Sequence, residues 1–282
     1  MKKNGMAFDT IRNVDKALSA LSQKCDLSKP EVVKATIARF ESNGYKRSLS
    51  YAYDKYAQYY GIKWEKPNYW QPRKIPKIPI EKHLECIIAS APMKTSTALA
   101  ISKDTGLRPI ELMNLTLKDI DLTNGVIYPE TAKHGQPRVL KIKRRTLSML
   151  LAWIQKMNIK PNEKIFLGWK TANYSKSFRY FRNKVAKKLH NPSIRTIKLY
   201  HFRHFYATML LKRTNNILIV KQKLGHTNIN HTLLYAQILD IESDDNYSCE
   251  IAENVEQARK LIENGFEYIT EMDDTKLFRK RK

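Results

Sequence analysis

The chain has few cysteines, no long apolar run, and far fewer acidic than basic residues. Its 282 residues include only Cys25, Cys86 and Cys249, which are far apart and odd in number. We therefore expect neither a disulfide framework nor a cysteine-based zinc site, and a reducing compartment fits this pattern. No apolar stretch approaches the ~18 residues of a membrane span, and the first ten residues lack the apolar core of a signal peptide. These absences predict a cytoplasmic protein.

The shortage of acidic residues gives the chain a strong positive charge. Its 51 lysines and arginines outnumber 27 aspartates and glutamates, for a formal charge of +24. The middle of the chain, residues 79–241, holds 28 basic and 9 acidic side chains, whereas residues 242–282 hold 7 and 11. A lysine-rich surface can simply confer solubility, but an excess this large and this localised favours a nucleic acid over a membrane surface as the partner.

The length and punctuation of the chain predict two domains and a tail. Residues 1–61 read as short helices, the second of them with Ser28 as N-cap and Asn43-Gly44 at its exit. Four prolines in KWEKPNYWQPRKIPKIPI exclude a helix there and predict an extended linker at residues 62–79.

The second domain, residues 80–241, reads as mainly helical with one small sheet. Asn124-Gly125 and His134-Gly135 are turn signals within residues 117–142, which predicts a small antiparallel sheet with Lys133 near its second turn. The tail, residues 242–282, reads as a helix capped by Asn254 and followed by a hairpin. Its acidic part fits either a solvated tail or a segment lying against a basic face, its own or a neighbouring protomer's. The fold class expected is mainly α with a small antiparallel β-sheet.

Four short motifs carry the chemistry: TGLRPIEL, TAKHGQPRVL, YHFRHFYAT and LGHTNINHTLLY. They place Arg108, Arg203 and a Gly-His pair upstream of Tyr235. Guanidinium groups match a phosphate bidentately and stay charged, so two of them suit the charge that builds up on a phosphodiester under attack. A tyrosine hydroxyl could attack that phosphate and a lysine on a hairpin could protonate the leaving oxygen.

In this order and at these separations, the motifs resemble the active-site boxes of tyrosine recombinases, the phage integrase and Xer superfamily. The resemblance covers about residues 80–240. It implies a two-domain enzyme that clamps double-stranded DNA and cuts and rejoins it through a 3′-phosphotyrosine, as a homo-tetramer, with no metal or nucleotide cofactor. A DNA-acting enzyme of this kind would be associated with the nucleoid. By the resemblance the site residues are these: Tyr235 as nucleophile, Arg108 and Arg203 as phosphate clamp, Lys133 as general acid, His226 as phosphate donor, and Glu111 as the support of Arg108.

One position departs from the common family pattern. Where a histidine usually stands three residues before the second arginine, this chain has Tyr200. On a helix Tyr200 shares a face with Arg203, and its hydroxyl can donate to the phosphate. We expect His201 and His204 to point elsewhere. His204 and His231 are interpreted as structural, because no pair of histidines has metal-ligand spacing with a carboxylate.

Competing interpretations remain open at this point. An isolated arginine is most often a surface group, Lys141 or Lys143 could replace Lys133, and Tyr247 is the best rival nucleophile although acids surround it. Lys143, Arg144 and Arg145 are expected to contact the DNA backbone. Two other functions fit less well: a type IB topoisomerase acting as a monomer, and a noncatalytic DNA-binding protein on the same fold.

Overall fold

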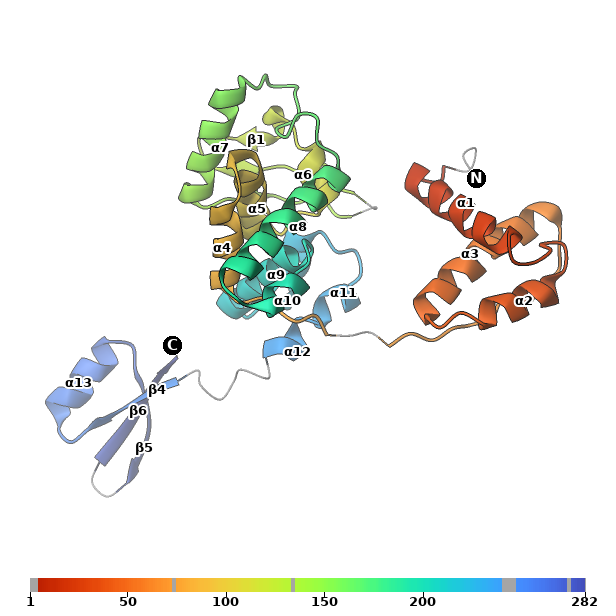
Figure 1. Ribbon diagram of the computed structural model, residues 1–282. Helices are drawn as coiled ribbons and strands as arrows, with labels where there is room; N and C mark the ends of the chain where they lie inside the picture. Colours follow the sequence, from red (N-terminus) through yellow and green to blue (C-terminus); the bar gives the residue numbers. More distant parts are fainter. Residues whose placement is uncertain (1–4, 73–74, 133–134, 240–246, 273–274, 282) are drawn as a thin grey trace. The chain divides into compact units, whose positions relative to one another are not determined.

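The computed structural model describes the whole chain except residues 1–4, 73–74, 133–134, 240–246, 273–274 and 282. Contacts divide the chain into two compact units, residues 1–74 and 75–282. The boundary falls inside the proline-rich segment 62–79, whose described residues form neither helix nor strand (Figure 1).

The first unit is a bundle of three helices: α1 Phe8–Ser22, α2 Pro30–Ala38 and α3 Asn43–Tyr60. Each turns its apolar side chains inward, and the fully buried ones include Leu21, Ile37 and Tyr53. Tyr53 also donates its hydroxyl hydrogen to the carbonyl of Leu27 at 3.0 Å, which fixes the loop between α1 and α2. Packing of apolar helix faces therefore holds this unit together.

The expected boundaries of α2 were wrong at both ends. Ser28 does not cap the helix, because its backbone and hydroxyl both bond to the carboxylate of Asp26, a local turn that competes with capping. Lys29 is the N-cap residue instead. At the other end, Asn43-Gly44 begins α3 rather than ending α2, and the Ser42 hydroxyl accepts from the backbone N–H of Tyr45.

The second unit is built around α5, Met93–Thr105, which is buried along nearly its whole length. It contacts α4 (Glu81–Ser90), α7 (Arg144–Met157), α8 (Thr171–Lys188) and α9 (His201–Thr214). A helix with neighbours on every side needs no polar face, which explains why α5 lacks an amphipathic stripe. Its C-terminal end, where the chain turns at Gly106, leads directly to Arg108.

A small antiparallel sheet follows, as the sequence predicted. Its order is β1 (Ile120–Asp121), β2 (Val126–Ile127) and β3 (Leu140–Lys141). The first turn contains Gly125 at a φ of +63°, which suits the Asn-Gly signal. The second expected turn includes Lys133 and His134, which lie outside the described residues.

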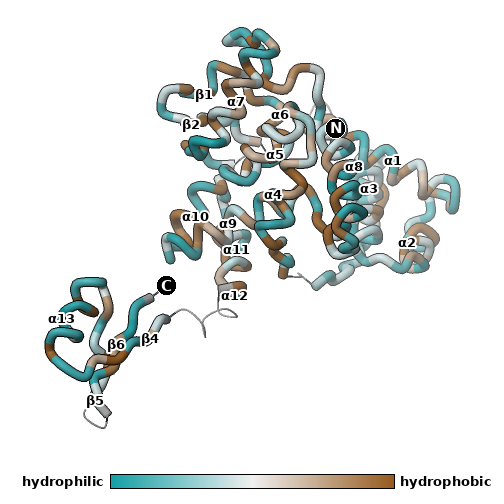
Figure 2. The backbone as a smooth tube through the Cα atoms, turned by 60° about the vertical axis from the view of Figure 1, so that its left-hand side comes forward, coloured by the Kyte–Doolittle hydropathy of each residue, from teal (hydrophilic) through white to brown (hydrophobic). Residues whose placement is uncertain are grey.

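The last helices of this unit form a second apolar cluster. After α6 (Pro109–Asn114) near the sheet, the chain later forms α10 (Ile217–Leu224), α11 (Asn230–Leu233) and α12 (Ala236–Leu239). Figure 2 shows the hydrophobic stretch of α10, which packs with α9 around the ring of Tyr235. The residue proposed as nucleophile is therefore part of a core.

The tail contains one helix, α13 (Val255–Glu263), and a sheet of three strands in the order β4-β6-β5. The expected hairpin is β5 (Glu267–Met272) with β6 (Thr275–Arg281), and Asn254 caps α13 by accepting from the Gln257 N–H at 2.9 Å. The third strand, β4 (Tyr247–Ala252), was not expected. It pairs with β6, although α13 and β5 lie between the two strands in the sequence. Pairing between strands so far apart in sequence leaves no local signal.

Candidate active site

Arg203 on α9 is deeply buried and only 2% exposed. Its guanidinium donates to the carbonyl of Gly106 at 2.7 Å and to that of Leu224 at 2.6 Å. These carbonyls belong to the C-terminal ends of α5 and α10, where the helix dipole favours a cation. Burial lowers the pKa of Arg203 to about 10, and Arg108 and Arg138 add to this effect, so the side chain is still charged at neutral pH.

Glu111 holds two arginines at once. Its side chain is fully buried; one oxygen accepts from Arg108 Nη1 at 2.7 Å, and the other accepts from the Arg108 backbone N–H at 2.9 Å and from Arg138 Nη2. Burial opposes the charge on Glu111, but the two arginines outweigh it and lower the pKa of the carboxyl. The contact expected between Glu111 and Arg108 is present, and it fixes the guanidinium at the start of α6.

Arg138 was missed by the sequence reasoning, although it lies in one of the quoted motifs. Its side chain is 1% exposed, and among the described residues its Nε and Nη1 have no hydrogen-bond partner. Gly225 makes room for it: a Cβ there would stand 2.8 Å from Arg138 Nη1, and φ at this glycine is +63°. The one sequence signal that could have indicated a buried arginine here is its position next to the apolar residues Val139 and Leu140. Two of the three arginines thus share the Glu111 carboxylate and Arg203 has backbone acceptors, which leaves the site strongly positive.

His226 links the arginine site to α11. Its Nε2 lies 3.0 Å from Arg203 Nη2, and its Nδ1 lies 2.9 Å from the Thr232 hydroxyl. A guanidinium can only donate, so His226 Nε2 accepts from Arg203. The hydrogen of the neutral ring is then on Nδ1, which donates a hydrogen bond to the Thr232 hydroxyl. Burial lowers the pKa of His226 to about 3, with Arg203 and Arg108 contributing, and the ring is neutral.

Tyr235 lies between α11 and α12 and is 2% exposed. Its ring packs on Ala207, Leu211 and Val220 in the second cluster. Its hydroxyl is 2.9 Å from His204 Nδ1. Burial raises the pKa of Tyr235, and Arg203 lowers it only in part, so the hydroxyl is a neutral phenol.

The expectation that His204 points away from the site was wrong. His204 follows Tyr200 by four residues, and side chains four apart on a helix are neighbours just as those three apart are. The ring centroids of Tyr200 and His204 lie 5.2 Å apart, and those of His204 and Tyr235 lie 5.7 Å apart. Tyr200 itself is 43% exposed at the N-terminus of α9. An imidazole is thus present, one turn later than expected.

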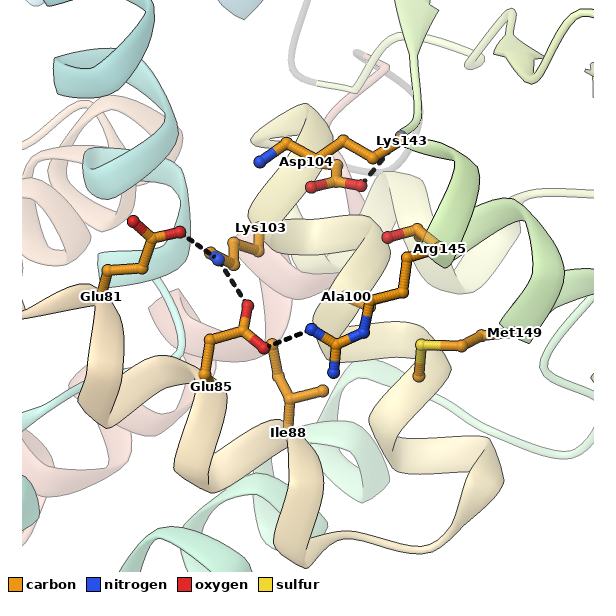
Figure 3. A pocket seen from close by; sticks show the side chains of 10 residues that line it. Glu81, Glu85, Ile88, Ala100, Lys103, Asp104, Lys143, Arg145 and Met149 are labelled. Atoms are coloured by element: carbon orange, nitrogen blue, oxygen red, sulfur yellow. Dashed lines mark hydrogen bonds and ion pairs between the residues drawn. The ribbon is translucent and has the colours of Figure 1, made fainter.

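The basic run after the sheet is partly engaged within the chain. The Lys143 N–H donates to Asp104 at 3.0 Å, and Arg144 begins α7. Arg145 pairs with Glu85 at 2.8 Å and is 67% exposed. Figure 3 shows Lys103 held between Glu81 and Glu85 beside Arg145, at a cavity of about 320 Å³. Arg145 therefore already has an ion-pair partner in Glu85. To contact the DNA backbone, its guanidinium would have to bind Glu85 and a phosphate at the same time or release Glu85.

The part of the chain that the structure describes contains no group of three or more His, Cys, Asp or Glu residues able to hold a metal ion. No described helix has the length and apolarity to cross a membrane.

Acid should weaken the folded state through the two buried histidines. The pKa of His226 is about 3 and that of His204 about 4 because of burial and nearby cations, against about 6.5 in an unfolded chain. The unfolded chain therefore binds more protons between these values, and the free energy of unfolding falls as pH drops from about 6.5 toward 4. We expect a loss of about 1 kcal/mol per histidine per pH unit, measured by urea unfolding at several pH values.

The substitution His226→Asn should reduce this slope, whereas His190→Asn, at an exposed residue, should not. A slope that is the same in all three proteins would contradict the assignment.

Comparison with known proteins identifies the family of this chain. The profile of the phage integrase family matches residues 79–241. A tyrosine recombinase of Thermosipho africanus is 28% identical over 246 residues, covering 83% of this chain and 82% of the relative. Among solved structures, the Tn1549 transposon integrase bound to transposon right end DNA superposes with a TM-score of 0.60 at 20% identity, covering 86% of this chain and 96% of that one. A lambda integrase dimer bound to a COC′ core site gives 0.62 at 13%, covering 82% and 89%. The chain belongs to the phage integrase family.

Proposed function

We propose that this chain is a site-specific DNA recombinase that cuts and rejoins DNA through a 3′-phosphotyrosine at Tyr235. One observation carries the proposal: within the family-matched region, the Tyr235 hydroxyl is hydrogen-bonded to His204, the residue that directly follows the buried Arg203. A hydroxyl nucleophile and fixed cations that bind the phosphate are what nucleophilic attack on a phosphodiester requires.

In the proposed reaction Arg108 and Arg203 bind the nonbridging oxygens of the scissile phosphate. The Tyr235 oxygen bonds to phosphorus, the bond to the 5′-oxygen breaks, and Lys133 protonates that oxygen. The reverse attack by a 5′-hydroxyl restores the DNA and frees Tyr235. His226 supports Arg203 and, when the phosphate takes the guanidinium, donates to the phosphate in its other tautomer, with the hydrogen on Nε2 and Nδ1 accepting from the Thr232 hydroxyl. Tyr200, exposed at the N-terminus of α9, donates a further hydrogen bond to the phosphate.

The proposed partner is double-stranded DNA. The Tn1549 integrase was solved on transposon end DNA and lambda integrase on a core site, and the same kind of substrate suits a chain of charge +24. We further propose that residues 1–61 bind DNA together with residues 80–241, that 62–79 join the two, and that four protomers act on two sites.

A nicked suicide substrate tests the function directly. When the short strand beyond the cut diffuses away, religation is impossible and the covalent complex accumulates, so wild-type protein should form an adduct that survives detergent. Peptide mapping should locate the nucleotide on the peptide that contains Tyr235. Native gels of the same reaction should show four protomers with two DNA sites.

Two outcomes would favour the alternatives. Relaxation of supercoils by a monomer, with no exchange between two sites, would indicate a topoisomerase. Tight DNA binding without any adduct on the suicide substrate would indicate a noncatalytic DNA-binding protein.

A further inference from the structure

His204 is a partly buried titratable side chain to which the reaction above gives no role. Its Nδ1 is 2.9 Å from the Tyr235 hydroxyl, and the two ring centroids are 5.7 Å apart. It follows Arg203 directly on α9, so one helix turn carries both the phosphate-binding guanidinium and the ring at the nucleophile. The attacking oxygen therefore already has a hydrogen-bond partner inside the protein.

The surroundings of His204 keep its ring neutral. Arg203 and His201 on the same helix are the positively charged or titratable neighbours that oppose its protonation, and the ring centroids of Tyr200 and Tyr235 lie 5.2 and 5.7 Å from that of His204. Burial is the largest cause and, with these neighbours, lowers the pKa of His204 to about 4. With its hydrogen on Nε2, a neutral imidazole presents the Nδ1 lone pair to the phenol.

We propose that His204 is a catalytic residue, the general base that removes the proton from Tyr235. The inference rests on the recombinase function proposed above. As the Tyr235 oxygen bonds to phosphorus, its proton moves to His204 Nδ1, and the leaving 5′-oxygen takes a separate proton from its own donor. In religation the imidazolium returns the proton to the departing Tyr235 oxygen. Every proton is thus recovered over one cleavage and religation cycle.

A bound phosphodiester makes His204 a better base. The charge of Arg203 disfavours the imidazolium while the site is empty. A phosphate anion on the guanidinium offsets that charge at short range, because opposite charges within a few ångströms stabilise each other in a buried site. Proton removal is then favoured only when DNA occupies the site, which restrains the nucleophile in free protein.

Tyr200 is a weaker candidate for this role. It stands where the family usually has histidine, but it is 43% exposed, and no hydrogen bond joins it to Tyr235 among the described residues. A phenol is also a poor proton acceptor compared with imidazole. The ring of His204, hydrogen-bonded to Tyr235, supplies the missing imidazole.

A substrate with sulfur in place of the bridging 5′-oxygen separates the base from the acid. Sulfur leaves without a proton, so loss of the general acid is masked on this substrate and loss of the base is not. Single-turnover rates of adduct formation are measured with saturating full-length protein on the oxygen and sulfur substrates. The variants are His204→Asn, His204→Phe and Lys133→Ala, with His201→Asn as the matched control on the same helix. DNA affinity of each variant reports folding.

Asparagine keeps a hydrogen bond to Tyr235 but takes up no proton. We expect His204→Asn and His204→Phe to slow adduct formation about a hundredfold on both substrates, with DNA affinity unchanged. Lys133→Ala should be slow on oxygen and near wild type on sulfur, and His201→Asn should be near wild type on both.

A His204→Asn rate within threefold of wild type overturns the inference, and so does rescue of His204→Asn by sulfur. If His204→Phe does not bind DNA, His204→Asn alone decides. Absence of any wild-type adduct on either substrate overturns the proposed function itself.

Discussion

Replacing Tyr235 with phenylalanine should abolish the covalent protein–DNA adduct and leave DNA affinity unchanged. The variant lacks the oxygen that bonds to phosphorus, and no other side chain is expected to replace it. The phosphate contacts of the arginines are retained, so binding, measured by gel shift, should remain within twofold. The readout is the adduct on a nicked suicide substrate after denaturing electrophoresis.

The same substitution should change stability very little. Phenylalanine keeps the ring in the cluster with Ala207, Leu211 and Val220 and loses one hydrogen bond to His204. We expect a decrease of about 1 kcal/mol in the free energy of unfolding. Tyr247→Phe is the matched control, because Tyr247 is the rival nucleophile. Adduct formed by Tyr235→Phe and lost in Tyr247→Phe would show that the nucleophile was assigned wrongly.

Removal of the Glu111 carboxylate should be the most destabilising change in the site. In Glu111→Ala the charges of Arg108 and Arg138 stay buried with no carboxylate between them. Loss of one partner from a buried ion pair typically costs about 3–5 kcal/mol, and we expect a value in this range from urea unfolding. Glu111→Gln keeps the shape but not the charge and should lose nearly as much.

The exposed Glu130 provides the control, and Glu130→Gln should be neutral within about 0.5 kcal/mol. A Glu111→Gln protein as stable as wild type would mean that shape and hydrogen bonding, rather than charge, hold the two arginines.

Local patterns predicted much of the fold. The helix expected at RRTLSMLLAWIQKM is α7 with the same ends, and the Asn124-Gly125 turn joins β1 and β2. Such elements depend on residues close in sequence, where periodicity and turn chemistry act. The prediction of Ser28 as an N-cap was wrong because another local interaction competes with capping: the Ser28 hydroxyl bonds to the carboxylate of Asp26.

Contacts between distant residues could not be predicted in this way. His204 and Tyr235 are 31 positions apart, and Arg138 reaches Glu111 across 27. A single sequence gives no signal for either of these two contacts, because both depend on how α9, α10 and the sheet pack. The family pattern singled out Arg108, Arg203 and Tyr235, but it passed over Arg138, favoured Tyr200 and left His204 among the structural residues.

The two strong hydrogen bonds of Arg203 go to backbone carbonyls at Gly106 and Leu224. Every amino acid carries such a carbonyl, so substitutions at position 224 that preserve the helix end cannot remove the acceptor. Arg108, by contrast, depends on one particular side chain. The side chain at position 224 can therefore vary, within what a buried site accepts, while the orientation of Arg203 persists.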